Sequence, residues 1–175
     1  MGAAAEGDVP MRRIVSGTGP LLSLTEARAL DLLGRAGQVH VPEVVAAEME
    51  DETPGWSEQR PAWIVVKALA GPYRDEAVAW QEAGLLGVRE AEAVALARQL
   101  KADWLLTDDA AARLFGRTFG LEVHGSLAIV LWAAAVRHLG PAEADAALIR
   151  LAKSPFWISA KVLREARATL KDIFR

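Results

Sequence analysis

The chain contains no cysteine, and only three of its 175 residues are histidine. The lack of cysteine excludes disulfides, thiolate zinc sites, iron–sulfur clusters and cysteine nucleophiles. The histidines, His40, His124 and His138, are too widely spaced to predict an imidazole metal cage, and none has a neighbour typical of acid–base catalysis. Any metal ion that this chain binds is therefore expected to have oxygen ligands.

A strong net charge and a long hydrophobic run are also missing. The 20 Lys and Arg residues against 23 Asp and Glu give a formal charge of −3, so a nucleic-acid partner would need local basicity. The longest apolar run, 127–136, is far shorter than the roughly 20 residues that a bilayer span needs. The first residues, MGAAAEGD, have neither a basic leader nor an apolar core. We therefore predict a cytoplasmic protein that makes no membrane contact.

Short apolar runs alternate with longer segments of helical period from residue 12 onward. Strands are expected at 12–16, 39–41, 63–69, 103–107 and 121–124. One or two helices are expected over 20–35, ended by Gly37, and further helices at 42–50, 73–83, 89–100, 108–119, 126–138, 141–153 and 159–171. The stretch 51–61 is dense in turn formers and is predicted to be a loop. Residues 1–11 have no periodicity, so we expect a flexible lead-in there and a single domain over 12–175. Strands separated by helices predict an α/β domain with a mostly parallel sheet, whose ligands bind at the carboxyl ends of its strands.

Acidic residues follow the fourth predicted strand. Asp108 and Asp109 are adjacent carboxylates of the kind that hold Mg²⁺ or Mn²⁺, although aspartate is also a preferred helix N-cap. Glu90 and Glu92 lie two positions apart on a helix and so cannot share a face, which allows at most one of them to join Asp109 at an ion. Glu48 lies on the helix after the second strand, and without further context it is predicted to be a surface residue, because glutamate is mostly exposed.

Five segments, taken in order and spacing, resemble a known family. They are IVSGTGPLLSL, VHVPEVVAAEM, REAEAVALARQLKADWLLTDDAAARLFG, VHGSLAIVLWA and FWISAKVLREA. Together they resemble the PIN-like domains of the DUF3368 type, relatives of the VapC ribonuclease toxins, from about residue 12 to the C-terminus. The resemblance implies a three-layer α/β/α domain with a helical C-terminal end. It also implies an acidic pocket that binds Mg²⁺ or Mn²⁺ and cleaves single-stranded RNA, in a homodimer restrained by an antitoxin protein.

The resemblance assigns roles residue by residue. It implies catalytic and metal-binding roles for three carboxylates, Glu48, Glu92 and Asp109. Asp108 is the expected auxiliary metal ligand, and support of the pocket is expected from Gly17, Thr18 and Thr107. Whether Glu90 or Glu92 is the ligand on their helix stays open at this stage.

Gly17 departs from the family pattern, which resembles V-S-D-T-[SG]-P at the end of the first strand. Ser16 and Thr18 are neutral and do not replace the missing carboxylate. Loss of a central ligand weakens metal binding and misplaces the attacking water, and misplacement can cost on the order of 100-fold in rate. We therefore expect an impaired metal-dependent ribonuclease, with a catalytically inert RNA- or protein-binding module as the alternative. A phosphatase that uses Asp108 or Asp109 as its nucleophile is a third hypothesis.

Local basicity is present in two places. Arg113 and Arg117 lie four residues apart on the helix that follows Asp109, where they can contact substrate phosphate. Lys161, Arg164 and Lys171 can share one face near the C-terminus, either as a phosphate-binding stripe or as an ordinary solvated face.

Six tryptophans lie along the chain. Trp63, Trp104 and Trp132 lie in apolar contexts and are expected in the core. Trp56 follows a Pro-Gly pair in the predicted loop, which would suit an exposed platform for base stacking or an anchor at an interface.

Overall fold

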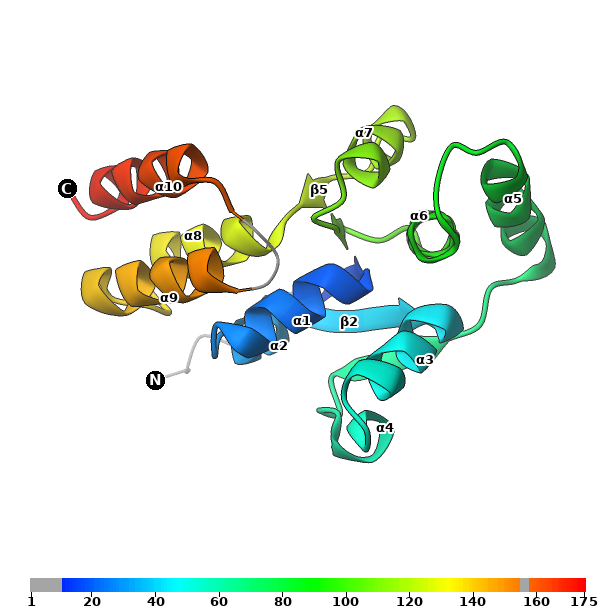
Figure 1. Cartoon of the computed structure of the whole chain (residues 1–175), viewed down its shortest axis with the longest axis horizontal. Helices are drawn as coiled ribbons and strands as arrows, with labels where there is room; N and C mark the ends of the chain where they lie inside the picture. The colour runs from blue at the N-terminus through cyan, green and yellow to red at the C-terminus, as the bar shows by residue number, and fades with distance from the viewer. Residues whose placement is uncertain (1–10, 155–157) are drawn as a thin grey trace, which may run out of the picture.

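A computed structural model describes residues 11–154 and 158–175 of the chain. The predicted flexible lead-in therefore lies outside the described residues, apart from Met11. The molecule is built around a sheet of five parallel strands in the order β3-β2-β1-β4-β5 (Figure 1). The strands are β1 Arg12–Ser16, β2 Gly37–Pro42, β3 Ile64–Lys67, β4 Trp104–Leu106 and β5 Val123–His124. The predicted α/β class and parallel sheet are confirmed.

Helices follow every strand and cover both faces of the sheet. Their bounds are α1 Thr18–Glu26, α2 Asp31–Ala36, α3 Glu43–Glu52, α4 Trp56–Gln59, α5 Gly71–Glu82, α6 Val88–Leu100, α7 Ala110–Thr118, α8 Ser126–Ala135, α9 Pro141–Lys153 and α10 Ala160–Ile173. Helices α8, α9 and α10 pack together as the predicted helical C-terminal end (Figure 1). Within residues 11–154 and 158–175, no helix has the length and apolar character needed to cross a membrane.

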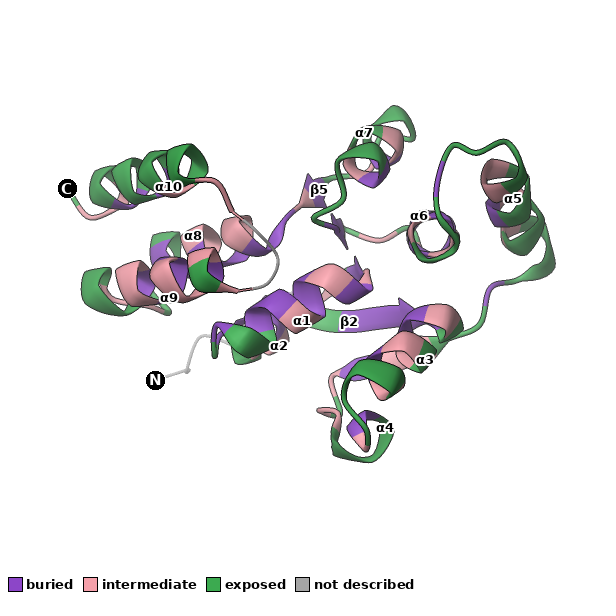
Figure 2. Ribbon diagram, viewed as in Figure 1, coloured by how far each residue is buried: buried purple, intermediate pink, exposed green. Residues whose placement is uncertain are grey.

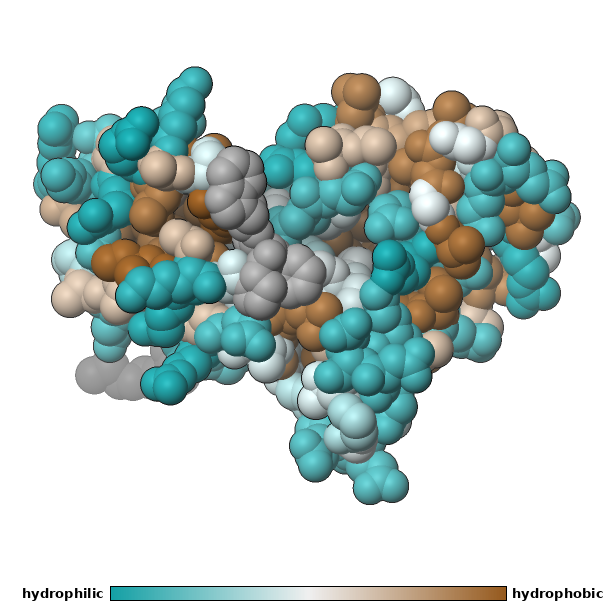
Figure 3. All heavy atoms as spheres, in the orientation of Figure 1, coloured by the Kyte–Doolittle hydropathy of each residue, from teal (hydrophilic) through white to brown (hydrophobic). Residues whose placement is uncertain are grey.

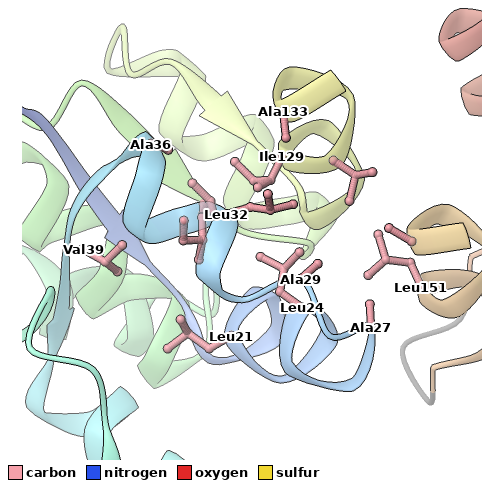
Figure 4. Close-up of a cluster of buried hydrophobic side chains, with 14 of the residues drawn as sticks. Leu21, Leu24, Ala27, Ala29, Leu32, Ala36, Val39, Ile129, Ala133 and Leu151 are labelled. Carbon is pink, nitrogen blue, oxygen red and sulfur yellow. The ribbon is translucent and has the colours of Figure 1, made fainter. Parts of the chain in front are cut away.

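The strands are buried on both faces, and alternate side chains enter two separate clusters. Ile14 packs with α1, α2, α8 and α9, whereas Val15, the next residue, packs with α5, α6 and α7. Leu106 and Leu105 divide between the same two clusters, as the two-residue period of a strand requires. Figure 2 shows the resulting purple interior, and Figure 4 shows how α1, α8 and α9 meet on the first face. The three-layer α/β/α arrangement is thus confirmed.

The segment 20–35, predicted as one or two helices, contains two, α1 and α2, separated by a turn in which Arg28 has a φ of +56°. Gly37 ends this helical unit as the C-cap of α2 and is also the first residue of β2. A Cβ at this position would lie 2.3 Å from the carbonyl oxygen of Arg12, so glycine is needed for β2 to approach β1.

The predicted loop over 51–61 contains the short helix α4, which begins at Trp56. Trp56 is only 7% exposed and belongs to the first buried cluster, so the expectation of an exposed stacking platform is wrong. Trp104 is buried as expected. Trp63 and Trp132 are partly buried against the same cluster.

Candidate functional site

A pocket of about 760 Å³ opens at the carboxyl ends of β1 and β4. Four carboxylates line it, from Glu48, Glu90, Asp108 and Asp109, together with two guanidinium groups, from Arg89 and Arg113. The opposite wall is more apolar and comes from the C-terminal helices, including Leu131 and Leu151. The pocket therefore has an acidic side built on the sheet and an apolar side built on α8, α9 and α10.

The acidic side is assembled by very short connections. Only Gly17 separates β1 from α1, and its N–H donates to the carbonyl oxygen of Leu106 at the end of β4, at 3.0 Å. Parallel neighbours end at the same edge of a sheet, so the first turns of α1 and α7 begin side by side. The N-termini of α6 and α8 reach the same pocket through residues 89–90 and 125–126. Helix N-termini carry unpaired N–H groups and favour negative charge, which explains why carboxylates collect here.

Asp109 is the N-cap of α7. Its carboxylate accepts a hydrogen bond from the backbone N–H of Ala112 at 2.8 Å, and its own N–H donates to the hydroxyl of Thr107 at 3.2 Å. Thr107 is itself buried, and its N–H pairs with the carbonyl of His124 on β5. The capping role that the sequence left open is therefore present, and it fixes the direction of the Asp109 side chain.

Asp108 performs the same task for α8. One carboxylate oxygen accepts from the backbone N–H of Ser126 at 2.8 Å, and the other accepts from the Ser126 hydroxyl. A Cβ on Gly125 would lie 2.7 Å from Asp108 Oδ1, so the glycine lets this carboxylate reach the helix. Both Asp108 oxygens thus accept hydrogen bonds from Ser126, which ties the end of β4 to the first turn of α8.

Glu48 reaches the pocket from α3. The Thr18 hydroxyl donates to one carboxylate oxygen at 2.6 Å, and the guanidinium of Arg89 forms an ion pair with the other. The side chain of Glu48 is 21% exposed. It joins α1, α3 and α6, and its charge is balanced by Arg89 rather than left open.

The helix α6 carries the remaining carboxylate, and the structure places Glu90, not the expected Glu92, at the pocket. Glu92 points toward α3 and α5. Burial and the neighbouring charge of Glu43 raise its pKa above the ordinary value, against the lowering effects of the Val44 N–H and Arg74. Residues two apart on a helix face nearly opposite directions, so only one of the two can line the pocket.

Gly17 lies among these side chains with space around it. Its backbone is extended, with φ −75° and ψ 177°, a conformation open to any residue. A Cβ added there would meet only the Leu106 carbonyl oxygen, at an ordinary contact distance of 3.7 Å. An aspartate is therefore compatible with the backbone at this position.

The candidate phosphate-binding residues lie in different places relative to the pocket. Arg113 is partly buried and lines the pocket, whereas Arg117, one turn further along α7, is exposed and is not part of the lining. Lys161, Arg164 and Lys171 are exposed on α10, where hydrophilic side chains are prominent in Figure 3. Lys161 lies 3.9 Å from Glu165, as an ordinary solvated pair does.

The carboxylates do not form a metal site in their present arrangement. Across residues 11–154 and 158–175, no three side chains of Asp, Glu or His gather closely enough to hold one ion. Asp108 and Asp109 are held at the first turns of α8 and α7, Glu48 is held by Thr18 and Arg89, and Gly17 contributes no carboxylate. Carboxylate oxygens are the ligands that a hard cation prefers, but these carboxylates lie too far apart to share one ion.

Arg89, Gly125 and Ser126 line the pocket although the sequence assigned them no role there, whereas Glu90 was left as the alternative to Glu92. The pair Gly125–Ser126 did carry a signal, since a glycine before serine at the start of an apolar helical run is typical of a helix N-terminus. Arg89 gave no comparable signal, because its partner Glu48 is 41 residues away in the chain.

The comparison with known families agrees with this geometry. A family model described as DUF3368, a PIN domain, matches residues 13–172. No curated protein matches the chain closely enough to count as a relative. The match spans nearly the whole chain and accords with the parallel sheet covered by helices on both faces. The chain therefore belongs to the DUF3368 family of PIN domains, which have a nuclease-type fold.

Proposed function

We propose that this chain is a ribonuclease domain of the VapC toxin type whose pocket binds single-stranded RNA but hydrolyses its phosphodiesters poorly, because Gly17 replaces an aspartate. The observation that carries the proposal is the place of Gly17. It ends the central strand β1, is bonded to the end of β4, and opens onto the pocket that Glu48, Glu90, Asp108 and Asp109 line.

The effect of the missing side chain follows from the charges around it. PIN domains generally use divalent metal ions, and such a site needs several carboxylates that converge on one point. Here Glu48 is held by Thr18 and Arg89, and the two aspartates are held by helix N-termini. Without a carboxylate at position 17, these three side chains lack a further oxygen donor from the end of β1, so weak hydrolysis is expected even when Mg²⁺ or Mn²⁺ is plentiful.

Binding of RNA does not require the missing carboxylate. The Arg113 guanidinium lies in the pocket and has the planar donor geometry that suits a phosphate group. Arg117, exposed on the same helix, is placed to meet the backbone of a strand that leaves the pocket along α7. We assign substrate contact to these two residues, with Arg113 at the pocket itself.

Restoring the carboxylate tests the proposal. The Gly17→Asp variant in Mn²⁺ should cleave a mixed pool of cellular RNA at least on the order of 100-fold faster than the parent chain. Fluorescence anisotropy should show that the parent already binds labelled single-stranded RNA. If the folded Gly17→Asp variant cleaves no faster than the parent, the nuclease part is wrong and an inert binding module remains.

Two matched variants make the result specific. Gly17→Asn has nearly the same size without the charge and should stay inactive. Gly19→Asp adds the same carboxylate two residues away in the same lining, where a Cβ meets nothing within 4 Å, and should also stay inactive. Activity in either variant would mean that added charge or bulk, rather than a ligand at position 17, explains the gain.

Three further features belong to the proposal: a homodimer, a cognate antitoxin protein and a cytoplasmic location. They are features of the VapC toxin type, which the family match supports only at the level of the PIN domain. Light scattering should give twice the mass of 18.8 kDa for the isolated protein. A monomer at micromolar concentration would contradict the dimer.

A further inference from the structure

A second hollow, of about 410 Å³, lies at the far end of α1. It lies between the turn after α1, helix α2, the turn after α8 and one face of α9, and we call it the arginine groove. Its charged and polar lining consists of Arg28, Asp31, Arg35, His138, Glu143 and Arg150. Three guanidinium groups thus face two carboxylates, which leaves an excess of positive charge in a protein whose formal charge is −3.

The guanidinium groups of the arginine groove are available to a ligand. Arg28 and Arg35 are exposed, and neither side chain forms a hydrogen bond or ion pair with any residue in the part of the chain that the structure describes. Arg150 is partly buried, and its Nε donates to the carbonyl oxygen of Ala27 at 2.6 Å. That bond fixes the plane of the guanidinium and leaves its two terminal nitrogens for an anion.

Arg28 adds an independent observation. Its φ of +56° lies in the left-handed region, and its N–H and that of Ala29 close the end of α1 by donating to the carbonyls of Thr25 and Leu24. Glycine is the usual residue at such a helix end, because a side chain there strains the backbone by an amount on the order of 1 kcal/mol. The chain places a long cationic side chain where glycine would be more stable. Lys101 and Arg137 have the same left-handed φ after α6 and α8, so Arg28 differs from them by its place in the lining of the arginine groove.

The arginine groove and the pocket are connected by the same two helices. α1 begins at the pocket and ends at the groove, and its nine residues span about 13 Å. On α9, Arg150 lines the groove and the next residue, Leu151, lines the pocket. Figure 4 shows Ala27 facing Leu151 between the two. A few nucleotides of a single strand cover this distance, and about four do so if the bases keep a duplex-like rise of about 3.4 Å.

We propose that the arginine groove binds a backbone phosphate of the RNA strand whose neighbouring segment occupies the pocket. This inference rests on the proposed RNA-binding function and adds a second contact point for the same strand. Arginine suits the task because its donors match two phosphate oxygens at once.

The Arg28→Gly variant is expected to weaken RNA binding without lowering the stability of the fold. The variant should be at least as heat-stable as the parent, because it relieves the left-handed strain. It should nevertheless bind a labelled 12-nucleotide single-stranded RNA several-fold more weakly at low salt. Combined with Arg35→Gln, it should lower the slope of log affinity against log salt by about 0.7 for each phosphate that the protein no longer neutralises. The matched control, Arg164→Gln, removes an exposed charge from α10 and should leave both quantities near those of the parent.

RNA length provides the second readout. A dinucleotide has a single bridging phosphate and so cannot hold a phosphate at the pocket and at the groove at once, and when it binds in the pocket its affinity should be insensitive to Arg28→Gly. Unchanged affinity and salt slope for the 12-nucleotide RNA would overturn the groove while leaving the pocket and its Gly17→Asp test intact. An equal loss in Arg164→Gln would also overturn it, since general charge would then explain the effect. Failure of the parent to bind any RNA would overturn both proposals.

Discussion

The pocket and the arginine groove use charge in opposite ways. In the pocket, Asp108 and Asp109 are bonded to the first turns of α8 and α7, and Glu48 is bonded to Thr18 and Arg89. In the groove, the side chains of Arg28 and Arg35 touch no charged partner among the described residues. Charges that are paired within the protein hold its elements together. Charges without a partner add little to stability and remain available to a ligand.

Asp108 should show the largest effect on stability. Asp108→Ala leaves the backbone N–H and hydroxyl of Ser126 without their acceptor, and we expect a loss of about 1–3 kcal/mol in the free energy of unfolding. Urea denaturation measures it. Arg35→Gln, the matched change in the groove, should stay within about 0.5 kcal/mol of the parent. Equal losses in the two variants would remove the distinction between paired and unpaired charges.

Glu48 should show a smaller effect. Glu48→Gln keeps the shape but weakens the ion pair with Arg89, which is partly exposed, so we expect a loss of up to about 1 kcal/mol. Glu90→Gln changes the other glutamate of the pocket, whose side chain has no hydrogen bond or ion pair within residues 11–154 and 158–175, and should cost less than about 0.5 kcal/mol. In the Gly17→Asp background, both variants should reduce RNA cleavage. A Glu90→Gln variant that cleaves normally would exclude Glu90 from the chemistry.

His40 is a buried titratable group in the sheet that lines neither the pocket nor the arginine groove. It lies on β2, is 7% exposed, and its Nδ1 has no partner among the described residues. Burial lowers its pKa below the ordinary value, helped by the charges of Lys67 and Arg13. The folded protein therefore binds a proton at His40 less readily than the unfolded chain, in which histidine titrates near pH 6.5. The free energy of unfolding consequently falls as the pH decreases below about 6.5.

The effect of His40 at neutral pH is the smallest of the three, because the unfolded chain takes up little of this proton above a pH of about 6.5. His40→Gln should flatten the dependence of the melting temperature on pH between about 5 and 7. Asp108→Ala should lower the melting temperature at both ends of that range. An unchanged pH profile in His40→Gln would assign the acid sensitivity to other groups.

The fold could be predicted because its signals are local. Buried strands such as Ile14-Val15 and Leu105-Leu106 are short apolar runs, and the helices between them have a clear period. Parallel strands present ligands at their carboxyl ends, and this rule places Gly17 and Asp109 at one edge of the sheet from the sequence alone. For these two residues, the strand that each one follows is enough to predict its place in the fold.

The rest depends on geometry that local patterns do not contain. The choice between Glu90 and Glu92 turns on how α6 is rotated about its axis against α3, which a pattern of two glutamates leaves open. Trp56 is buried because α4 folds back onto the core, although its surroundings in the sequence are those of a loop. The arginine groove joins residues 28 and 150, which meet only where α1 packs against α9.

The two outer strands of the sheet bear on how the protein behaves at high concentration. β5 is only two residues long, and β3 has four, ends at Lys67 and follows Pro61 closely. Short edges, charge and nearby proline give another chain few free backbone groups with which to pair. The two longest strands, β1 and β2, lie inside the sheet, so strand-to-strand aggregation of the folded protein is discouraged at both edges.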